Sequence, residues 1–378
     1  MCIHIKYYEY RISLSRPIIR FLILSLILSS LLILYNCFKP TIRDDFFKYK
    51  YNDPYKDIDL LMNSRIKTNK VNACIVVLAR NNELYQLKSS MRQFEERWNK
   101  KFNYPYVFLN DVEFSEAFIN QTSSITQSET KYAVIPKEMW SYPSWINQTK
   151  AAENRKKAEQ DHVIYGGSES YRHMCRFNSG FFFRHPALLD YDYYWRLEPS
   201  VEFMCDIDYD PFLFMKKNDL YYGFTISLYE FEDTIPTLWN TTKKFMKEYP
   251  HYINDDNSLK WVTNDENNYN LCHFWSNFEI ANLNFWRSEQ YIKYFEYLDK
   301  EGGFFYERWG DAPVHSLGLA LFVNKSKIHF FNDISYSHPP YQHCPIDKEF
   351  HESGRCHCNP NKSFDTDWYS CTEKWWAL

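Results

Sequence analysis

Several carboxylates occupy positions from which they could bind a metal ion or meet a reacting group. Glu198 directly follows an apolar, strand-like run, and Pro199 after it favours an extended backbone at the glutamate. Glu230 closes a second such run. Asp206 and Asp208 have the spacing of a metal-binding turn, although acidic pairs are also common on solvated turns. We therefore expect Glu198 to have the better position.

The segment 165–177 (YGGSESYRHMCRF) concentrates side chains that could contact phosphate. Arg172 and Arg176 lie four residues apart, so one face of a helix would carry both guanidinium groups. Such a pair could neutralise a diphosphate or a carboxylate. An ordinary ion-pair helix has the same spacing, so both interpretations stay open.

A further carboxylate, Glu279, lies in the aromatic run 272–279 (CHFWSNFE). Burial among such rings would cost free energy unless the carboxylate is hydrogen-bonded or used in function. Three histidines, His315, His338 and His343, are candidate metal ligands. A single histidine is more often structural, so the sequence does not choose among them.

The elements that would position these residues begin with a β-α-β unit. Residues 73–79 (ACIVVLA) form an apolar run of strand length. Apolar residues then recur at helical spacing over 84–98, and 106–109 (YVFL) is the next strand-like run. This order predicts parallel strands joined by a right-handed crossover, with a nucleotide bound at their carboxyl ends.

Later runs add to the same body. Residues 193–197 and 221–228 predict strands, and 312–322 predicts a short apolar helix. No linker rich in proline, glycine or serine divides the sequence after residue 70. We therefore expect one α/β domain over residues 71–378.

The composition narrows the classes of function. The net charge of −4 gives no general reason to expect a nucleic-acid partner. Only nine of the 378 residues are glycine, and neither GxGxxG nor GxxxxGK[ST] occurs, so the common glycine-rich phosphate loops are absent. Aromatic residues reach 19%, which suits a core of large rings or a cleft in which rings stack on sugars.

The N-terminal region predicts a membrane anchor. Residues 21–38 are predominantly apolar, just long enough to span the hydrocarbon, and four basic residues precede them. That asymmetry predicts a cytoplasmic tail over 1–20, a signal-anchor over 21–38 and a stem over 39–70, with the body in the lumen. A cleaved signal peptide is the alternative, but no small-x-small cleavage site follows the apolar run.

Cysteines and glycosylation sequons also favour the lumen. Eight cysteines follow the predicted anchor, an even number that predicts disulfides in an oxidising compartment. A zinc site built from the last four is the alternative, although no C-x2-C spacing is present. The five N-x-[ST] sequons begin at Asn120, Asn147, Asn240, Asn324 and Asn361.

At these segments the chain resembles the fungal α-1,2-mannosyltransferase family, glycosyltransferase family 15. The resemblance covers roughly residues 71–378. The strings that carry it are YGGSESYRHMCRFNSGFFFRHP (165–186), YYWRLEPSVEFMCDIDYD (193–210), YGFTISLYE (222–230), NLCHFWSNFEIANLNFWRS (270–288), GGFFYERWGDAPVHS (302–316) and SYSHPPYQHCP (335–345). It implies a mixed α/β nucleotide-sugar fold of the GT-A type, with its sheet flanked by helices.

The resemblance also implies site residues. Glu279 matches the family's proposed nucleophile, and Tyr171 matches its catalytically important tyrosine. Glu198, Glu230 and His338 match the positions expected to bind Mn2+. We expect Tyr171, Arg172 and Arg176 to contact the donor. The chain departs from the family at Ser200, where relatives commonly carry aspartate.

The expected function is therefore a Golgi-type transferase, anchored by one helix. It would move mannose from GDP-mannose, with Mn2+ and retention of configuration, onto mannose-terminated N- or O-linked glycans. A catalytically inactive mannan-binding lectin or scaffold of the same fold is one alternative, and a secreted glycoside hydrolase is another. The hydrolase would need two carboxylates and no nucleotide.

Overall fold

The computed structural model describes residues 70–264 and 268–378. The chain divides into two units, residues 1–64 and 65–378, and every element described below lies in the second. The predicted tail and anchor and the stem up to residue 69 lie outside the described residues. Among the helices of the part described, none is long and apolar enough to cross a membrane.

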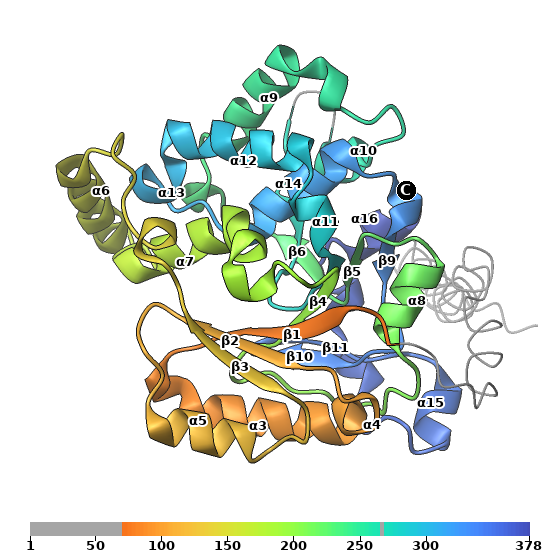
Figure 1. Cartoon of the computed structure of the whole chain (residues 1–378). Helices are drawn as coiled ribbons and strands as arrows, with labels where there is room; N and C mark the ends of the chain where they lie inside the picture. The colour runs from red at the N-terminus through yellow and green to blue at the C-terminus, as the bar shows by residue number, and fades with distance from the viewer. Residues whose placement is uncertain (1–69, 265–267) are drawn as a thin grey trace, which may run out of the picture. The chain divides into compact units, whose positions relative to one another are not determined.

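A seven-stranded mixed sheet forms the centre of this unit (Figure 1). Its strands are β1 (Ala73–Leu78), β2 (Tyr106–Asn110), β3 (Thr130–Val134), β4 (Tyr193–Arg196), β5 (Tyr222–Phe224), β8 (Ile280–Asn282) and β9 (Ile328–Phe330). They are ordered β3-β2-β1-β4-β8-β5-β9. The first four run parallel, and β8 is antiparallel to both of its neighbours. The predicted α/β class and the parallel β-α-β unit are confirmed.

The register of the parallel strands brings their polar ends together. Leu78 at the end of β1 pairs with Leu109 of β2, and Val76 pairs with Arg196 at the end of β4. The residues that follow these strands therefore share one edge of the sheet. This is the edge at which α/β folds bind nucleotides.

Helices cover both faces of the sheet (Figure 1). One face carries α3 (Leu84–Phe94), α4 (Lys100–Phe102) and α5 (Glu116–Ser123). The other carries α7 (Glu169–Gly180), α12 (Glu289–Glu301) and α14 (Asp311–Phe322). The remaining α-helices are α6 (Gln148–Gln160), α8 (Pro211–Lys217), α9 (Leu238–Glu248), α10 (Leu259–Val262), α11 (Leu283–Trp286), α13 (Gly303–Tyr306), α15 (Lys348–Glu352) and α16 (Thr372–Ala377).

Two small two-stranded sheets complete the fold. β6 (Ser227–Tyr229) pairs with β7 (Cys272–Phe274), and β10 (Tyr336–His338) pairs with β11 (Tyr341–His343), both antiparallel. The prediction of one strand over 221–228 is therefore wrong. The chain leaves the central sheet after β5 and forms β6 in another sheet. Because the apolar run is continuous in sequence, it does not reveal that the pairing strand changes.

Large aromatic rings fill the core, as the composition suggests. The largest fully buried side chains include five tryptophans: Trp98, Trp195, Trp261, Trp286 and Trp309. Some ring pairs meet edge-to-face, as Phe94 and Trp195 do at 4.8 Å, and others stack, as Trp261 and Phe274 do at 4.1 Å. Most of the aromatic content is therefore structural, which makes exposed rings more informative.

Six of the eight cysteines in the described body form three disulfides. They join Cys205 to Cys356, Cys272 to Cys371, and Cys344 to Cys358. Each of the last four cysteines is in a disulfide, which rules out the zinc alternative there. The expectation that all eight would pair is wrong, because Cys74 and Cys175 are free thiols within the apolar core.

Candidate functional site

Two adjoining cavities open at the carboxyl edge of the parallel strands. The first cavity, about 430 Å³, lies at the ends of β1 and β2, beside Ala79, Arg80, Asn110 and Asp111. The second cavity has a similar volume of about 430 Å³ and reaches toward β6, β10 and the C-terminal segment. The residues that line both are Tyr165, Tyr171, Met174, Arg196, Glu198 and His338.

Glu198 and His338 lie at the junction of the two cavities. Glu198 comes just after β4 and His338 ends β10, so the two arrive from different sheets. His338 Nε2 is 3.9 Å from Glu198 Oε2, and Trp275 packs its ring 5.1 Å from the imidazole. A carboxylate and an imidazole that close are a donor set that suits Mn2+. These two residues therefore fit the predicted metal.

The third predicted ligand, Glu230, lies in the second cavity only. Its Oε1 is 3.4 Å from Arg308 Nη2, and the same oxygen accepts a hydrogen bond from the Phe231 backbone amide. Over residues 70–264 and 268–378, no three His, Cys, Asp or Glu side chains converge in a way that could hold a metal ion. Glu230 therefore has Arg308 as its partner in this structure, and its role as a metal ligand stays a prediction.

Tyr171, on the first turn of α7, forms part of the wall of both cavities. The ring of Tyr165 stacks on it at 4.5 Å, and the guanidinium of Arg308 lies 5.3 Å from its ring centroid. Burial raises the pKa of Tyr171 well above 10. The hydroxyl is therefore protonated at neutral pH and can both donate and accept a hydrogen bond.

Arg196 lines both cavities and connects three carboxylates, those of Glu198, Asp311 and Glu279. It donates to Glu198 Oε1 at 2.8 Å and to Asp311 Oδ2 at 2.7 Å, and its Nη1 lies 3.7 Å from Glu279 Oε1. Burial works against its charge, but these three carboxylates outweigh burial and raise the pKa of Arg196. Burial would raise the pKa of Asp311, but Arg196 and His315 lower it overall, so Asp311 stays ionised.

Glu279 lies below this layer, at the start of β8. It is 1% exposed and lines neither cavity, whereas Asp311 lines the second. The buried hydroxyls of Tyr194 and Tyr222 lie beside it, and burial together with the Glu279 charge raises the pKa of both. The sequence predicted that burial of this carboxylate would cost free energy unless it is hydrogen-bonded or used in function. Charged and polar groups do surround Glu279, so they offset the cost of burying it.

A proton lies between Glu279 and His315. His315 Nε2 is 3.0 Å from the carbonyl oxygen of Asn178, which can only accept, so this nitrogen carries a hydrogen. His315 Nδ1 is 3.1 Å from Glu279 Oε2. With Glu279 ionised, the pair is an imidazolium hydrogen-bonded to a carboxylate.

The two predicted donor-binding arginines lie away from both cavities. Arg172 donates to the backbone carbonyls of Ser168 and Glu307. Arg176 forms a two-pronged ion pair with Asp299, with Nε and Nη2 at 2.7 and 2.8 Å from the carboxylate oxygens. Both do lie on a helix, as predicted, but they join α7 to neighbouring segments. We therefore revise their role to a structural one.

The other candidate residues also have structural partners. Asp206 pairs with Arg97 at 2.6 Å, Asp208 lies 3.3 Å from Lys101, and neither carboxylate lines the cavities. His343 is buried, with Nδ1 2.9 Å from Asp365 Oδ2. Of the predicted residues, the structure brings together Tyr171, Glu198, Glu230 and His338 around one space.

Sequence reasoning missed four residues that line the second cavity: Arg196, Asn277, Arg308 and Asp311. All four lie inside the strings that carry the family resemblance, but no spacing rule singled them out. Asn277 Oδ1 and Arg308 Nε are buried with no hydrogen-bond partner among the described atoms. Each of these two residues therefore lines the cavity while one of its polar atoms is buried without a partner.

Backbone strain also marks the site. Ser200 and Tyr165 line the cavities and have φ angles of +66° and +55°. Side chains other than glycine rarely adopt this left-handed region, and such residues gather at ligand sites. Ser200, where relatives commonly carry aspartate, therefore also has a rare left-handed backbone conformation.

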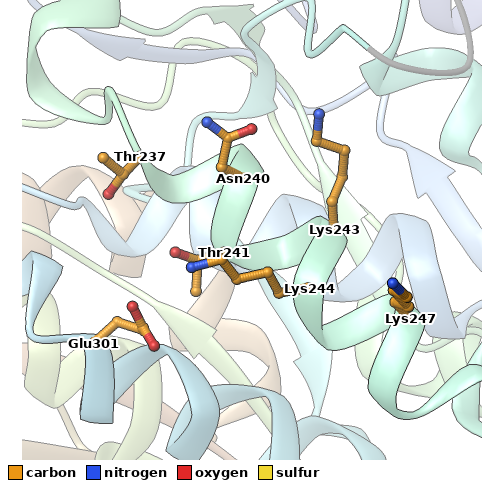
Figure 2. A pocket seen from close by; sticks show the side chains of 7 residues that line it. All are labelled: Thr237, Asn240, Thr241, Lys243, Lys244, Lys247 and Glu301. Carbon is orange, nitrogen blue, oxygen red and sulfur yellow. The ribbon is translucent and has the colours of Figure 1, made fainter.

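A separate hollow of about 600 Å³ lies beside α9 (Figure 2). Figure 2 shows that threonine, asparagine, lysine and glutamate side chains surround it. None of the predicted catalytic or metal-binding residues lines it. Its position over Asn240 places one predicted sequon on an exposed helix surface.

Comparison with known proteins gives close relatives. Glycolipid 2-alpha-mannosyltransferase 2 of Candida albicans is 56% identical over 311 residues, which cover 82% of this chain and 68% of that protein. Alpha-1,2 mannosyltransferase KTR1 of Saccharomyces cerevisiae is 56% identical over 307 residues, covering 81% and 78%.

Two solved structures are similar to this chain in both fold and sequence. Core-mannan synthase A of Aspergillus fumigatus, in its Mn/GDP form, is 43% identical, with a TM-score of 0.77 over 84% of this chain and 87% of that chain. Mannosyltransferase Ktr4p of S. cerevisiae, in complex with GDP, is 39% identical, with a TM-score of 0.78 over 89% and 96%. The family model described as glycolipid 2-alpha-mannosyltransferase matches residues 41–378. The chain belongs to this family, glycosyltransferase family 15.

Proposed function

We propose that this chain is a retaining α-1,2-mannosyltransferase that uses GDP-mannose and Mn2+. Its acceptors would be mannose-terminated N- or O-linked glycans of secreted and cell-wall glycoproteins. The observation that carries the proposal is the pair Glu198 and His338, held where a cavity at the carboxyl ends of β1 and β2 meets an aromatic cavity. Two similar enzymes solved with GDP, one also with manganese, support the donor and the metal.

The first cavity suits the nucleotide and the second suits the sugars. Glu198 and His338 would hold Mn2+, which supplies positive charge to the diphosphate leaving group. Tyr171 faces both cavities and, with Arg308 against its ring, is positioned to donate to the donor's phosphate or sugar oxygens. Arg308 and Asn277 also line the second cavity and would supply further polar contacts.

The carboxylates of Asp311 and Glu279 lie at different depths and would have different roles. Asp311 lines the second cavity and stays ionised beside Arg196, so it can orient a hydroxyl or face positive charge on the transferred sugar. Glu279 lies one layer deeper and shares a proton with His315. This depth favours Glu279 as a stabiliser of an oxocarbenium-like transition state over direct attack on the sugar.

Donor screening with the purified protein tests the proposal. GDP release should require GDP-mannose together with a mannoside acceptor, stop with EDTA and return with Mn2+. His338→Ala should raise the Mn2+ concentration needed or abolish turnover, while Asp206→Asn, a carboxylate outside the cavities, should leave both unchanged. Release of mannose from a mannan without nucleotide would favour a hydrolase, and mannan binding without GDP release would favour a lectin.

We further propose a Golgi membrane location with the body in the lumen, anchored over residues 21–38. The support is the basic flank before the apolar run, the three disulfides and the exposed sequon asparagines Asn120, Asn147, Asn240 and Asn361. Endoglycosidase treatment of permeabilised membranes should lower the protein's mass. Cleavage of the body by protease added to the cytosolic side would contradict this topology.

A further inference from the structure

The second cavity continues to the surface along a row of aromatic rings. Trp275, next to His338, lies 5.5 Å from Tyr341, and Tyr341 lies 6.4 Å from Tyr369. From Tyr369 the row divides to Phe231 at 6.2 Å and Trp368 at 5.3 Å. We call these five residues the aromatic track.

The outer end of the aromatic track is exposed. Phe231 is 49% and Trp368 85% exposed, in a protein whose other rings mostly fill the core. Tyr369 and Tyr341 are half-buried and line the cavity itself. Large rings exposed next to a functional cavity indicate a binding surface, because leaving them in water costs free energy.

The charges beside the aromatic track narrow the class of ligand. The exposed acidic residues Glu232, Asp233 and Asp367 are sequence neighbours of Phe231 and Trp368. Their negative charge disfavours phosphorylated or acidic ligands at this end. Flat rings with polar edges instead suit neutral pyranose units, which offer an apolar face and hydroxyl groups.

We propose that the aromatic track binds the mannose units that precede the accepting mannose, so that the enzyme selects an oligomannose acceptor over a single mannoside. The inference rests on the proposed function and adds subsites to it. The accepting unit would lie near Trp275 and His338, and the next units would stack outward over Tyr341, Tyr369 and Trp368. Phe231 would close the opposite side of the outer subsite.

Acceptor length is the variable that tests the proposal. Phe231→Ala and Trp368→Ala should lower kcat/KM for an α-1,2-linked mannotriose by about tenfold through KM, since one lost aromatic contact of this kind is worth about that factor. The kcat/KM for methyl α-mannoside should change less than about twofold, because a single unit does not reach the outer end. Trp368→Tyr should restore most of the loss.

Tyr85→Ala is the matched control, since Tyr85 is 74% exposed on α3, on the opposite face of the sheet from α7. Unchanged kinetics for mannotriose in both track variants would overturn the proposal, as would equal losses for both acceptors. Calorimetric titration of mannotriose tests binding without turnover, and Trp368→Ala should weaken it. If Trp368→Ala weakens the binding of mannotriose but the wild type never releases GDP, the proposed function fails. The aromatic track would then still be a binding site for oligomannose.

Discussion

At the scale of single residues, the site is organised by depth. His338 and Glu198 lie where the cavities meet, Asp311 and Arg196 form the layer below, and Glu279 lies beneath them. Each charged group in the lower layers has an opposite charge or a proton-sharing partner. Such a buried network stabilises the fold only when every charge has a partner. Loss of one member should therefore leave another buried charge uncompensated.

Glu279→Gln tests the deepest member of this network. The amide keeps the shape of the side chain and can still donate to His315 Nδ1, so the fold and GDP binding should persist. Removing the charge should lower kcat by at least about a hundredfold, because stabilisation of charge in the transition state is lost. Single-turnover kinetics, with a GDP-binding measurement on the same sample, gives both quantities.

The matched control is Asp299→Asn, which neutralises another buried carboxylate. Asp299 pairs with Arg176 and lines neither cavity, so its loss should lower stability and leave kcat nearly unchanged. A Glu279→Gln enzyme with wild-type kcat would remove this residue from the sugar-transfer step.

At the scale of elements, the sequence predicted what local patterns can specify. The strands at 73–79, 106–109 and 193–197 and the helix at 312–322 are present within a residue or two of their predicted ends. Periodicity could not show that 221–228 contributes to two sheets, because the choice of partner strand depends on residues far along the chain. Helical spacing placed Arg172 and Arg176 on one helix but could not show which groups face them.

The candidate site also contains residues that the sequence could identify and residues that it could not. Tyr171, Glu198, Glu230 and His338 were identified by matched strings, and they do surround one cavity. Whether Glu230 faces a metal or Arg308 depends on a contact between segments 78 residues apart. Arg196 and Asp311 became candidates only when folding brought their opposite charges together.

The link between β11 and the C-terminal segment should depend on pH. Burial disfavours the charged form of His343, but Asp365 and the carbonyl of Asn332 outweigh burial and raise its pKa above 6.5. A raised folded-state pKa contributes stability that is complete below the unfolded value and is lost as pH rises through the folded value. The melting temperature should therefore fall as the pH rises above about 6.5.

His343→Gln isolates this contribution. The variant should melt at a lower temperature than the wild type below about pH 6, and the difference should shrink as the pH rises. His351→Gln is the control, since this histidine packs on a surface helix against the Pro345 carbonyl. A constant difference between His343→Gln and wild type across the pH range would contradict the assignment.

At the scale of the whole molecule, the C-terminal segment holds the second cavity together. Cys371 is bonded to Cys272 of β7, across 99 residues of sequence, and Thr372 contacts Ser227 of β6. The double variant Cys272→Ser, Cys371→Ser should have a free energy of unfolding that is lower by about 2–5 kcal/mol, the usual cost of losing a native disulfide. Denaturant unfolding of the double variant measures this.

The double variant should also lose affinity for mannotriose before it loses affinity for GDP. Tyr369 lies two residues before the disulfide, whereas the first cavity is built from β1 and β2. Equal losses for the two ligands at a temperature where the variant remains folded would show that the cavities are not stabilised separately.

The place of His338 and Tyr369 in the chain has a consequence for biosynthesis. The strands β1 and β2 beside the first cavity are translated early, but the imidazole beside Glu198 and the rings of Tyr341, Trp368 and Tyr369 are translated much later. A polypeptide that ends before His338 therefore has both strands but lacks an imidazole that lines both cavities. Any messenger truncated before codon 338 would encode a protein without turnover, so activity itself reports that translation reached this segment.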